Sequence, residues 1–233
     1  MTSSAPTEPR VLPRHVAIIG AAGGLGNGIL EVCRNEGISF TAIVRSRPER
    51  IAEVPEGSFV TVVPSLTDKA TLIDAFRGTD AVISAMGVTA ASHDSSALHS
   101  ANMPTIESSM VEAGVDRIIV TNTLLSAAPG ERASLTMRFF SMFPGTVGRG
   151  AREQRAVVDA LGRGSYSKLR WTLVRAGVNA RGKDVSPAAS LDWSEGINSW
   201  QPVSYGAMGR WMLEEAAANE FVRQAPFVSL GRN

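Results

Sequence analysis

The stretch "GAAGGLG", Gly20 to Gly26, decides how this chain folds. It follows the apolar, β-branched run "HVAII" and opens the segment "LGNGILEVCRNEG", whose apolar residues recur at helical spacing. Gly20, Gly23 and Gly26 form the template G-x-x-G-x-x-G, while Gly20, Gly24 and Gly26 form G-x-x-x-G-x-G. Either spacing predicts a buried strand, a tight glycine turn and a helix that begins directly after the turn.

This strand–turn–helix context gives the glycine loop a chemical meaning. Gly20 permits the tight turn, Gly23 or Gly24 lets the backbone approach a pyrophosphate, and Gly26 lets the helix pack closely on the strand. The free amides at the helix start then point at the anion. We therefore predict a dinucleotide-binding loop made of Gly20, Ala22, Gly23, Gly24, Leu25 and Gly26.

Apolar runs alternate with helical patterns along the rest of the chain. The expected strands are 15–19, 40–44, 59–63, 80–85, 117–121 and 170–175, and the expected helices are 25–36, 68–77, 95–113 and 149–162. A helix capped by Ser204 and a last strand over 225–231 complete the pattern. This alternation predicts an α/β fold, a doubly wound, mostly parallel Rossmann sheet with helices on both faces. We expect a flexible segment over 1–14 and a single domain over 15–233.

Two segments interrupt the alternation, at about 124–148 and 177–201. Both follow the carboxyl ends of expected strands, where doubly wound sheets bind ligands, and long loops at that edge are often functional. We expect them to act as lids over an apolar substrate pocket. The residues predicted to line that pocket are His93, Phe139, Phe140, Phe143, Trp193 and Trp200.

The end of the second strand indicates which dinucleotide is bound. An NAD site usually places an acidic residue there, which accepts a hydrogen bond from the ribose 2′-hydroxyl. This chain has Arg45, Ser46 and Arg47, with no carboxylate before Glu49. Because guanidinium groups bind phosphate through paired hydrogen bonds, the sequence favours NADPH.

Composition excludes several other classes of protein. The 233 residues are 44% hydrophobic and carry a formal net charge of +1, which gives no reason to expect nucleic acid or a membrane surface as partner. The single cysteine, Cys33, excludes an internal disulfide and is expected to be buried and inert, and the scattered histidines have no metal-ligand spacing. We expect a cytoplasmic protein with a small apolar substrate, as a monomer or a dimer.

The catalytic motif of the mainstream short-chain dehydrogenases is missing. Those enzymes combine G-x-x-x-G-x-G with Asn-Ala-Gly after the fourth strand and with a Tyr-x-x-x-Lys pair. Here the fourth strand ends in "SAMG", and the residues four positions after the two tyrosines, Tyr166 and Tyr205, are Arg170 and Gly209 instead of lysine. The sequence therefore favours the template G-x-x-G-x-x-G.

From about residue 15 to 230 the chain resembles the atypical short-chain dehydrogenase/reductase group, which includes biliverdin-IXβ reductase (also a flavin reductase) and NmrA-like proteins. The segments that carry the resemblance are "IIGAAGGLG", "AIVRSRPER", "DAVISAMG", "MVEAGVDRIIVTNT", "EQRAVVDAL", "LRWTLVRAG" and "PVSYGAMGRWMLE". No histidine stands near Val178, where biliverdin-IXβ reductase has one, so a tetrapyrrole substrate is not implied.

The resemblance also implies positions around the cofactor. Residues Ala85, Met86 and Gly87 are expected to pass the ribose, and Thr121 to Thr123 to reach the nicotinamide. The residues expected to close over the nicotinamide are Arg175, Ala176, Gly177 and Val178. Ser65 and Leu66 occupy the place of an Asp-hydrophobe pair near the adenine, with serine in place of the aspartate.

These features favour an NADPH-dependent reductase of an apolar aromatic or conjugated carbonyl-type acceptor, such as a quinone, a flavin or a polycyclic metabolite. Thr123 is the candidate donor to the developing oxyanion, and Asn122 offers an amide that could orient a carbonyl. Two alternatives remain open: an NADP(H)-binding redox sensor without turnover, and a non-redox isomerase or cyclase that uses the cofactor structurally.

Overall fold

A largely parallel sheet organises the protein, whose computed structural model describes residues 11–87, 98–132, 135–198 and 201–232. The strands run in the order β3-β2-β1-β4-β5-β6-β10-β8, with β9 paired to β10. Their bounds are β1 His15–Ile19, β2 Ser39–Val44, β3 Phe59–Val62, β4 Ala81–Ser84, β5 Arg117–Thr123, β6 Arg170–Ala176, β7 Val178–Lys183, β8 Ala188–Ser190, β9 Ile197–Asn198 and β10 Phe227–Gly231. Strands β1 to β6 and β10 are parallel, and β8 and β9 pair with β10 in the antiparallel sense.

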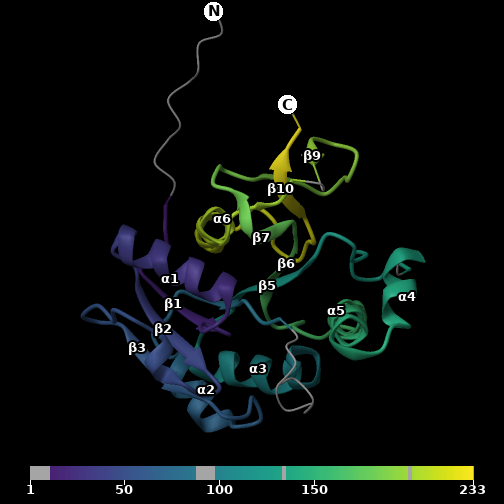
Figure 1. Ribbon diagram of the computed structural model, residues 1–233. Coiled ribbons are helices and arrows are strands. Elements are labelled where there is room, and N and C mark those ends of the chain that lie inside the picture. Colours follow the sequence, from purple (N-terminus) through teal and green to yellow (C-terminus); the bar gives the residue numbers. More distant parts are fainter. Residues whose placement is uncertain (1–10, 88–97, 133–134, 199–200, 233) are drawn as a thin grey trace, which may run out of the picture.

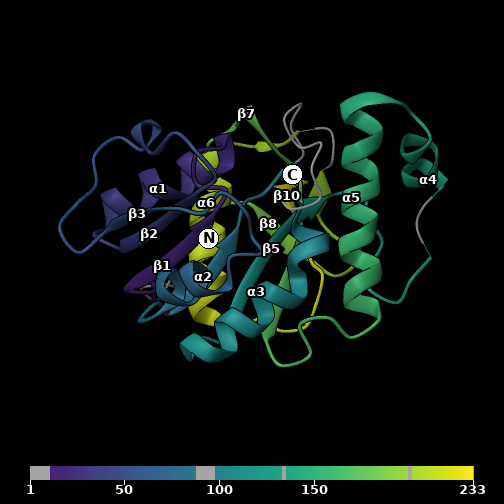
Figure 2. The same cartoon turned by 90° about the horizontal axis from the view of Figure 1, so that it is seen from below.

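Helices cover both faces of the sheet (Figure 1). Helices α1 (Gly24–Glu36) and α6 (Tyr205–Ala218) pack on one face, and α2 (Lys69–Phe76), α3 (His99–Ala113) and α5 (Gly145–Gly162) pack on the other. The short helix α4 (Leu135–Ser141) lies outside α5, on the side away from α1, in both Figure 1 and Figure 2. The predicted doubly wound Rossmann architecture is confirmed.

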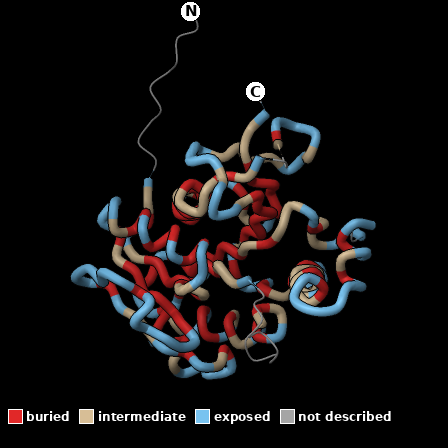
Figure 3. The backbone as a smooth tube through the Cα atoms, viewed as in Figure 1, coloured by how far each residue is buried: buried red, intermediate tan, exposed pale blue. Residues whose placement is uncertain are grey.

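The core consists of two apolar layers, one on each side of the sheet. Along β1, Val16 and Ile18 belong to the layer under α1 and α6, while Ala17 and Ile19 belong to the layer under α2 and α3. All four side chains are buried because successive residues of a strand point to opposite faces and both faces are covered. Figure 3 shows the buried residues concentrated along the middle of the molecule.

Strand β1 is the point where the strand order reverses. It pairs with β2 on one side and with β4 on the other, and Ile19 lies in register with both Ile43 and Ser84. In doubly wound sheets the crevice at this reversal, outside the carboxyl ends of the strands, is where ligands bind. A ligand is therefore expected at the carboxyl ends of β1, β2, β4 and β5.

A buried ion pair ties α6 to the sheet. Arg117 on β5 and Glu215 on α6 lie 2.7 Å apart, and their side chains are 1% and 3% exposed. Burial lowers the pKa of Arg117 to about 10, although the nearby Glu215 carboxylate opposes that shift. The contact fixes α6 on the face that carries α1, so that the first residue of α6, Tyr205, reaches the glycine loop.

Two parts of the fold differ from the sequence prediction. Helix α5 begins at Gly145 instead of 149, because the glycine-rich start "GTVGRG" has low helix propensity and resembles a loop. Helix α3 is described from His99, and its expected start at 95 lies outside the described residues. The two segments expected as lids contain α4 and the strands β7 to β9. Strand β7 escaped prediction because it is mostly exposed and polar.

Candidate functional site

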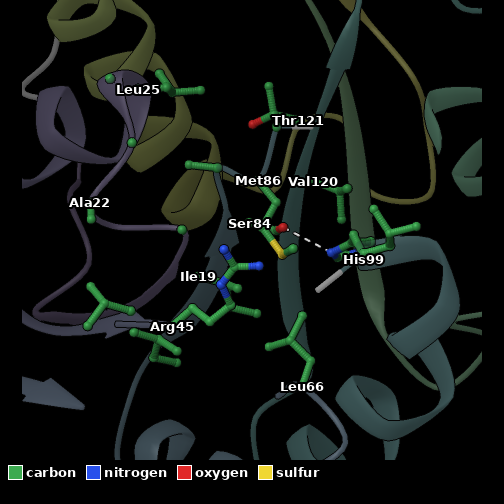
Figure 4. Close-up of a pocket in the computed structure, with 18 of the residues that line it drawn as sticks. Ile19, Ala22, Leu25, Arg45, Leu66, Ser84, Met86, His99, Val120 and Thr121 are labelled. Carbon is green, nitrogen blue, oxygen red and sulfur yellow. Dashed lines mark hydrogen bonds between the residues drawn. The ribbon is translucent and has the colours of Figure 1, made fainter. Parts of the chain in front are cut away.

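A cavity of about 810 Å³ opens at the carboxyl ends of β1, β2, β4 and β5. Its wall includes most of the residues predicted to bind a dinucleotide, namely Gly20, Ala22, Gly23, Gly24, Leu25, Arg45, Ser46, Arg47, Leu66, Ala85, Met86, Gly87, Thr121, Ala176 and Val178, together with Asn122 and Thr123. Figure 4 shows part of this wall, with Arg45 and Leu66 on one side and Thr121 on the other.

The glycine loop has the backbone geometry that its sequence predicted. Gly20 adopts a φ of +82°, a backbone conformation that residues other than glycine rarely adopt. A Cβ at Gly26 would overlap the carbonyl oxygen of Gly20 and lie 2.7 Å from Ala21 Cα, so α1 packs directly on the turn. Gly26 itself does not line the cavity, and its role is to let α1 pack closely on the loop.

The start of α1 provides amide groups for an anion. The first amide bonded within the helix is that of Asn27, which donates to the carbonyl of Gly23 at 2.8 Å. The amides of Gly24, Leu25 and Gly26 precede it and have no intrahelical acceptor. They lie at the positive end of the helix dipole, and Gly24 and Leu25 line the cavity, an arrangement that fits a pyrophosphate.

Tyr205, which the prediction did not include, also belongs to this wall. A Cβ at Gly24 would lie 2.6 Å from Cε2 of Tyr205, so the tyrosine ring packs against the glycine loop. Ser204 caps α6 by accepting a hydrogen bond from the amide of Ala207 at 3.0 Å, and this cap positions Tyr205.

Arginines gather at the end of β2. Arg45, Arg47 and Arg50 all line the cavity, and Ser46 lies between the first two. Arg47 has a φ of +59° and precedes a short 3₁₀ turn, Pro48–Arg50, which brings Arg50 back toward the wall. Three arginines therefore line this end of the cavity, where the sequence had indicated two.

The end of β3 contributes Val63, Pro64 and Leu66 to the wall. Leu66 lies in the wall and is 6% exposed. The neighbouring Ser65, predicted to lie near the adenine, does not line the cavity, because its hydroxyl accepts from the Thr67 amide at 3.2 Å and bonds the Thr67 hydroxyl at 2.8 Å. Ser65 thus shapes the turn after β3.

The end of β4 holds a buried chain of hydrogen bonds that the sequence did not reveal. The Ser84 hydroxyl lies 3.0 Å from Nδ1 of His99, and Nε2 of His99 lies 2.9 Å from the Tyr166 hydroxyl. Burial lowers the pKa of His99 to about 4 and raises that of Tyr166 well above its usual value, with the Glu107 carboxylate adding to the tyrosine shift. His99 is therefore neutral and Tyr166 protonated near neutral pH.

At the end of β5 the structure separates the roles of two predicted residues. Asn122 is 5% exposed and its amide is already engaged: Nδ2 donates to the Gln154 carbonyl at 3.1 Å, and Oδ1 accepts from the Thr123 amide at 2.8 Å and from the Ser126 hydroxyl at 2.7 Å. These bonds hold the backbone of Thr123, and the second Nδ2 hydrogen has no acceptor among the described residues, so the role of Asn122 toward a substrate carbonyl stays a prediction. The half-buried Thr123 has no partner for its hydroxyl among the described residues.

Only some of the predicted residues at the end of β6 line the cavity. Ala176 and Val178 line the cavity, while Arg175 and Gly177 do not, because alternate residues of a strand point to opposite faces. The Arg175 guanidinium lies 3.4 Å from the centre of the Phe227 ring, and its Nε donates to the Ala225 carbonyl at 2.7 Å. The expected placement of Arg175 over the nicotinamide is therefore wrong.

The aromatic residues expected to line a substrate pocket lie elsewhere. The rings of Phe139 and Phe140 on α4 and of Phe143 just after it pack against one another, with centroids 5.0 to 6.2 Å apart. Trp193 packs on Phe227 at 5.0 Å and lines a second hollow. None of these four lines the main cavity, which corrects the prediction, while His93 and Trp200 fall outside the described residues.

The two segments predicted to act as lids also lie largely away from the cavity. Of the described residues in 124–148 and 177–201, only Val178 belongs to the cavity wall. Helix α4 is held instead against α5, where Arg152 donates to the Ser141 carbonyl at 2.7 Å. Packing against α5 and against β10 thus explains why these segments lie away from the cavity.

The opposite wall of the cavity comes from α3 and α5, which the sequence analysis did not predict to contribute to the site. Its residues are Leu98, His99, Glu153, Gln154 and Val157. Both oxygens of Glu153 accept hydrogen bonds from Ser100, one from its amide at 2.8 Å and one from its hydroxyl at 2.5 Å. The carboxylate thereby caps the start of α3 from a different helix, a contact between residues that are distant in sequence.

Two further features bear on the exclusions made from composition. Cys33 is 0% exposed and burial raises the pKa of its thiol to about 12, which confirms it as an inert core residue. Within the described ranges, no helix is long and apolar enough to cross a membrane.

The fold, the glycine loop and the cavity together define an NAD(P)-binding Rossmann protein. Residues 20–192 match the family described as NAD(P)H-binding, and the chain belongs to this family. This confirms that the glycine loop and the strand pattern belong to an NAD(P)H-binding protein. No curated protein matches the sequence.

Solved structures share the fold at low sequence identity. The oxidoreductase ylbE from Lactococcus lactis aligns with a TM-score of 0.69 and 12% identity, over 94% of this chain and 92% of that chain. ChuY, an anaerobillin reductase from Escherichia coli O157:H7, aligns with a TM-score of 0.64 and 16% identity, over 92% and 96%. A wide-type short-chain dehydrogenase/reductase from Veillonella parvula, in complex with NADP, aligns with a TM-score of 0.62 and 19% identity, over 94% and 95%.

Proposed function

We propose that the protein is an NADPH-dependent reductase that transfers a hydride to an apolar aromatic or conjugated carbonyl-type acceptor, such as a quinone, a flavin or a polycyclic metabolite. One observation carries the proposal. A single cavity joins the glycine loop and the arginines of β2 to a wall that contains Thr123 and several apolar side chains. A dinucleotide held at the first end has space beside it for a second molecule.

Charge supports the preference for NADPH. Arg45, Arg47 and Arg50 line the end of the cavity where the 2′-phosphate of NADPH would lie, and no carboxylate of the described β2 end joins them in the wall. The Veillonella parvula neighbour with NADP bound supports the same choice, as a property of that protein.

The residues of this chain would bind and orient the two reactants. NADPH supplies the hydride when it is bound, and the protein orients the two reactants and surrounds them with apolar side chains. The wall that contains Thr123 also has apolar surface, provided by Val120, Val157 and Val178. The Thr123 hydroxyl, held by the bond from its amide to Asn122, is available to donate to the oxygen on which negative charge develops.

The acid–base groups of the wall restrict the acceptor. The described lining contains no lysine, its tyrosine packs on the glycine loop, and the Glu153 carboxylate is occupied by Ser100. A proton for the product would therefore come from water. Acceptors whose reduced forms are stabilised by conjugation suit such a site, and the ChuY neighbour carries the name of a reductase. We place the reaction in the cytoplasm, where NADPH is available.

The test is NADPH oxidation, followed by absorbance, with a panel of quinones, flavins and aromatic ketones. We expect turnover with at least one acceptor of the panel and a lower rate for the Thr123→Val variant, which keeps the shape and removes the hydroxyl. Tight binding of NADPH without oxidation by any acceptor of the panel would contradict the proposal and favour a redox sensor.

A further inference from the structure

A buried chain of three side chains runs from the core to the cavity wall. Tyr166 is 0% exposed, His99 is 4% exposed, and Ser84, the last residue of β4, is 1% exposed. Ser84 and His99 line the cavity, whereas Tyr166 lies behind His99. Figure 4 shows the bond from Ser84 to His99 beside Met86. The hydride transfer proposed above gives these groups no role.

The direction of the hydrogen bonds follows from the Tyr166 end. Its hydroxyl keeps its proton, and Nε2 of His99 is the one acceptor that the described residues offer it. Tyr166 therefore donates to Nε2. A neutral imidazole carries one hydrogen, so that hydrogen must lie on Nδ1, which donates to the Ser84 oxygen.

This direction leaves the Ser84 hydroxyl with a hydrogen that it cannot give to His99. No other acceptor for it is found in the described part of the chain. Ser84 is in register with Ile19 on β1 and with Val120 on β5, so it stands in the crevice where the strand order reverses. A buried donor needs an acceptor, and the cavity is the place from which a ligand can supply one.

We propose that Ser84 donates a hydrogen bond to an oxygen atom of the ligand in this cavity, and that His99 and Tyr166 are positioning residues that fix the direction of that bond. The inference rests on the proposed function for the identity of the ligand. The oxygen belongs either to a sugar hydroxyl of the dinucleotide or to the carbonyl of the acceptor.

The same chain is unsuited to proton transfer. If Ser84 gave its proton away, it would take one from His99, which would take one from Tyr166 and leave a tyrosinate in the core. A buried anion without a cationic partner is costly, and a fully buried hydroxyl has no direct route to regain a proton from water. The chain therefore orients a donor and moves no net charge.

The first measurement is the tautomer of His99 in the free protein, read from ¹⁵N chemical shifts in NMR and assigned by comparison with the His99→Gln variant. We expect hydrogen on Nδ1 in the natural chain and a shift toward hydrogen on Nε2 in Tyr166→Phe, which removes the donor that fixes the tautomer. Hydrogen on Nε2 in the natural chain would overturn the inference, whatever the protein binds.

The second measurement compares ligand binding. We expect Ser84→Ala to weaken NADPH binding, measured by calorimetry, or to raise the KM of an accepted substrate, by about three- to tenfold. The first result assigns the oxygen to the dinucleotide and the second assigns it to the acceptor. Tyr166→Phe should change the same constant by a smaller factor.

Ser109→Ala is the matched control. Ser109 lies on α3, its hydroxyl is buried without a hydrogen-bond partner, and it stands outside the cavity wall. It should leave both constants unchanged. If Ser84→Ala also leaves both unchanged, the inference is wrong. If the natural chain binds no NADPH, the proposed function fails, while the tautomer of the free protein still decides the direction of the chain.

Discussion

Substitution of Gly26 by alanine tests the geometry of the glycine loop. The added Cβ would overlap the Gly20 carbonyl oxygen and lie 2.7 Å from both Cα and the carbonyl oxygen of Ala21. All of these atoms belong to the backbone, so no side-chain rotation can relieve the contact. Either α1 or the turn must move away from its position.

The expected cost follows from this overlap. Forcing an extra carbon into packed structure destabilises a protein by about 1–3 kcal/mol, which for a chain of this size lowers Tm by roughly 2–12 °C. The same movement displaces the amides of Gly24 and Leu25 from the anion site. We therefore expect Gly26→Ala to weaken NADPH binding by at least about tenfold, or ~1.4 kcal/mol.

Thermal unfolding and calorimetric titration with NADPH measure the two effects separately. Gly206→Ala is the control, because the nearest atoms to its added Cβ would lie 3.9 Å away and alanine favours a helix. That variant should bind NADPH normally and unfold at the same or a higher temperature. If Gly26→Ala matches the natural chain in both Tm and affinity, the assignment of this loop to helix packing and anion binding is refuted.

Two further predictions concern hydroxyl chemistry and pH. Thr123→Val should reduce turnover of an accepted substrate by about tenfold at unchanged NADPH affinity, below the usual effect of an oxyanion donor because conjugation spreads the charge; unchanged turnover would remove Thr123 from the mechanism. His99 has a pKa of about 4 in the folded protein against an ordinary 6.5. The unfolded chain therefore gains a proton first as pH falls from 6.5 to 4, and the free energy of unfolding drops by about 3 kcal/mol. Denaturant unfolding of His99→Gln should show a shallower decline over that range, and an equal decline would contradict the assignment.

Much of the fold and the cofactor loop could be predicted because their signals are local in sequence. The loop from Gly20 to Gly26 carries its turn, its helix start and its packing contact within seven residues. Arg45 and Arg47 follow a strand whose end is clear from its apolar run. Such features depend on residues adjacent in the chain, and the structure places them in one cavity.

The remaining features depend on contacts between distant residues. His99 and Tyr166 are 67 residues apart and meet only when α3 packs on the sheet. The bond from Asn122 to the Gln154 carbonyl likewise joins residues 32 positions apart in the sequence. The aromatic residues near α4 failed as a pocket because apolar side chains far from the cavity satisfy one another equally well.

The arginines at the end of β2 are proposed to give this cavity its preference for NADPH. The most direct test of this proposal is calorimetric titration of the natural chain with NADPH and with NADH, repeated for the variant in which Arg45 and Arg47 are both alanine, with Arg77→Ala as an exposed control outside the cavity. We predict that NADPH binds at least about tenfold more tightly than NADH, that the double variant loses this preference with nearly unchanged NADH affinity, and that the control keeps it. Equal affinities of the natural chain for the two dinucleotides would contradict the claim.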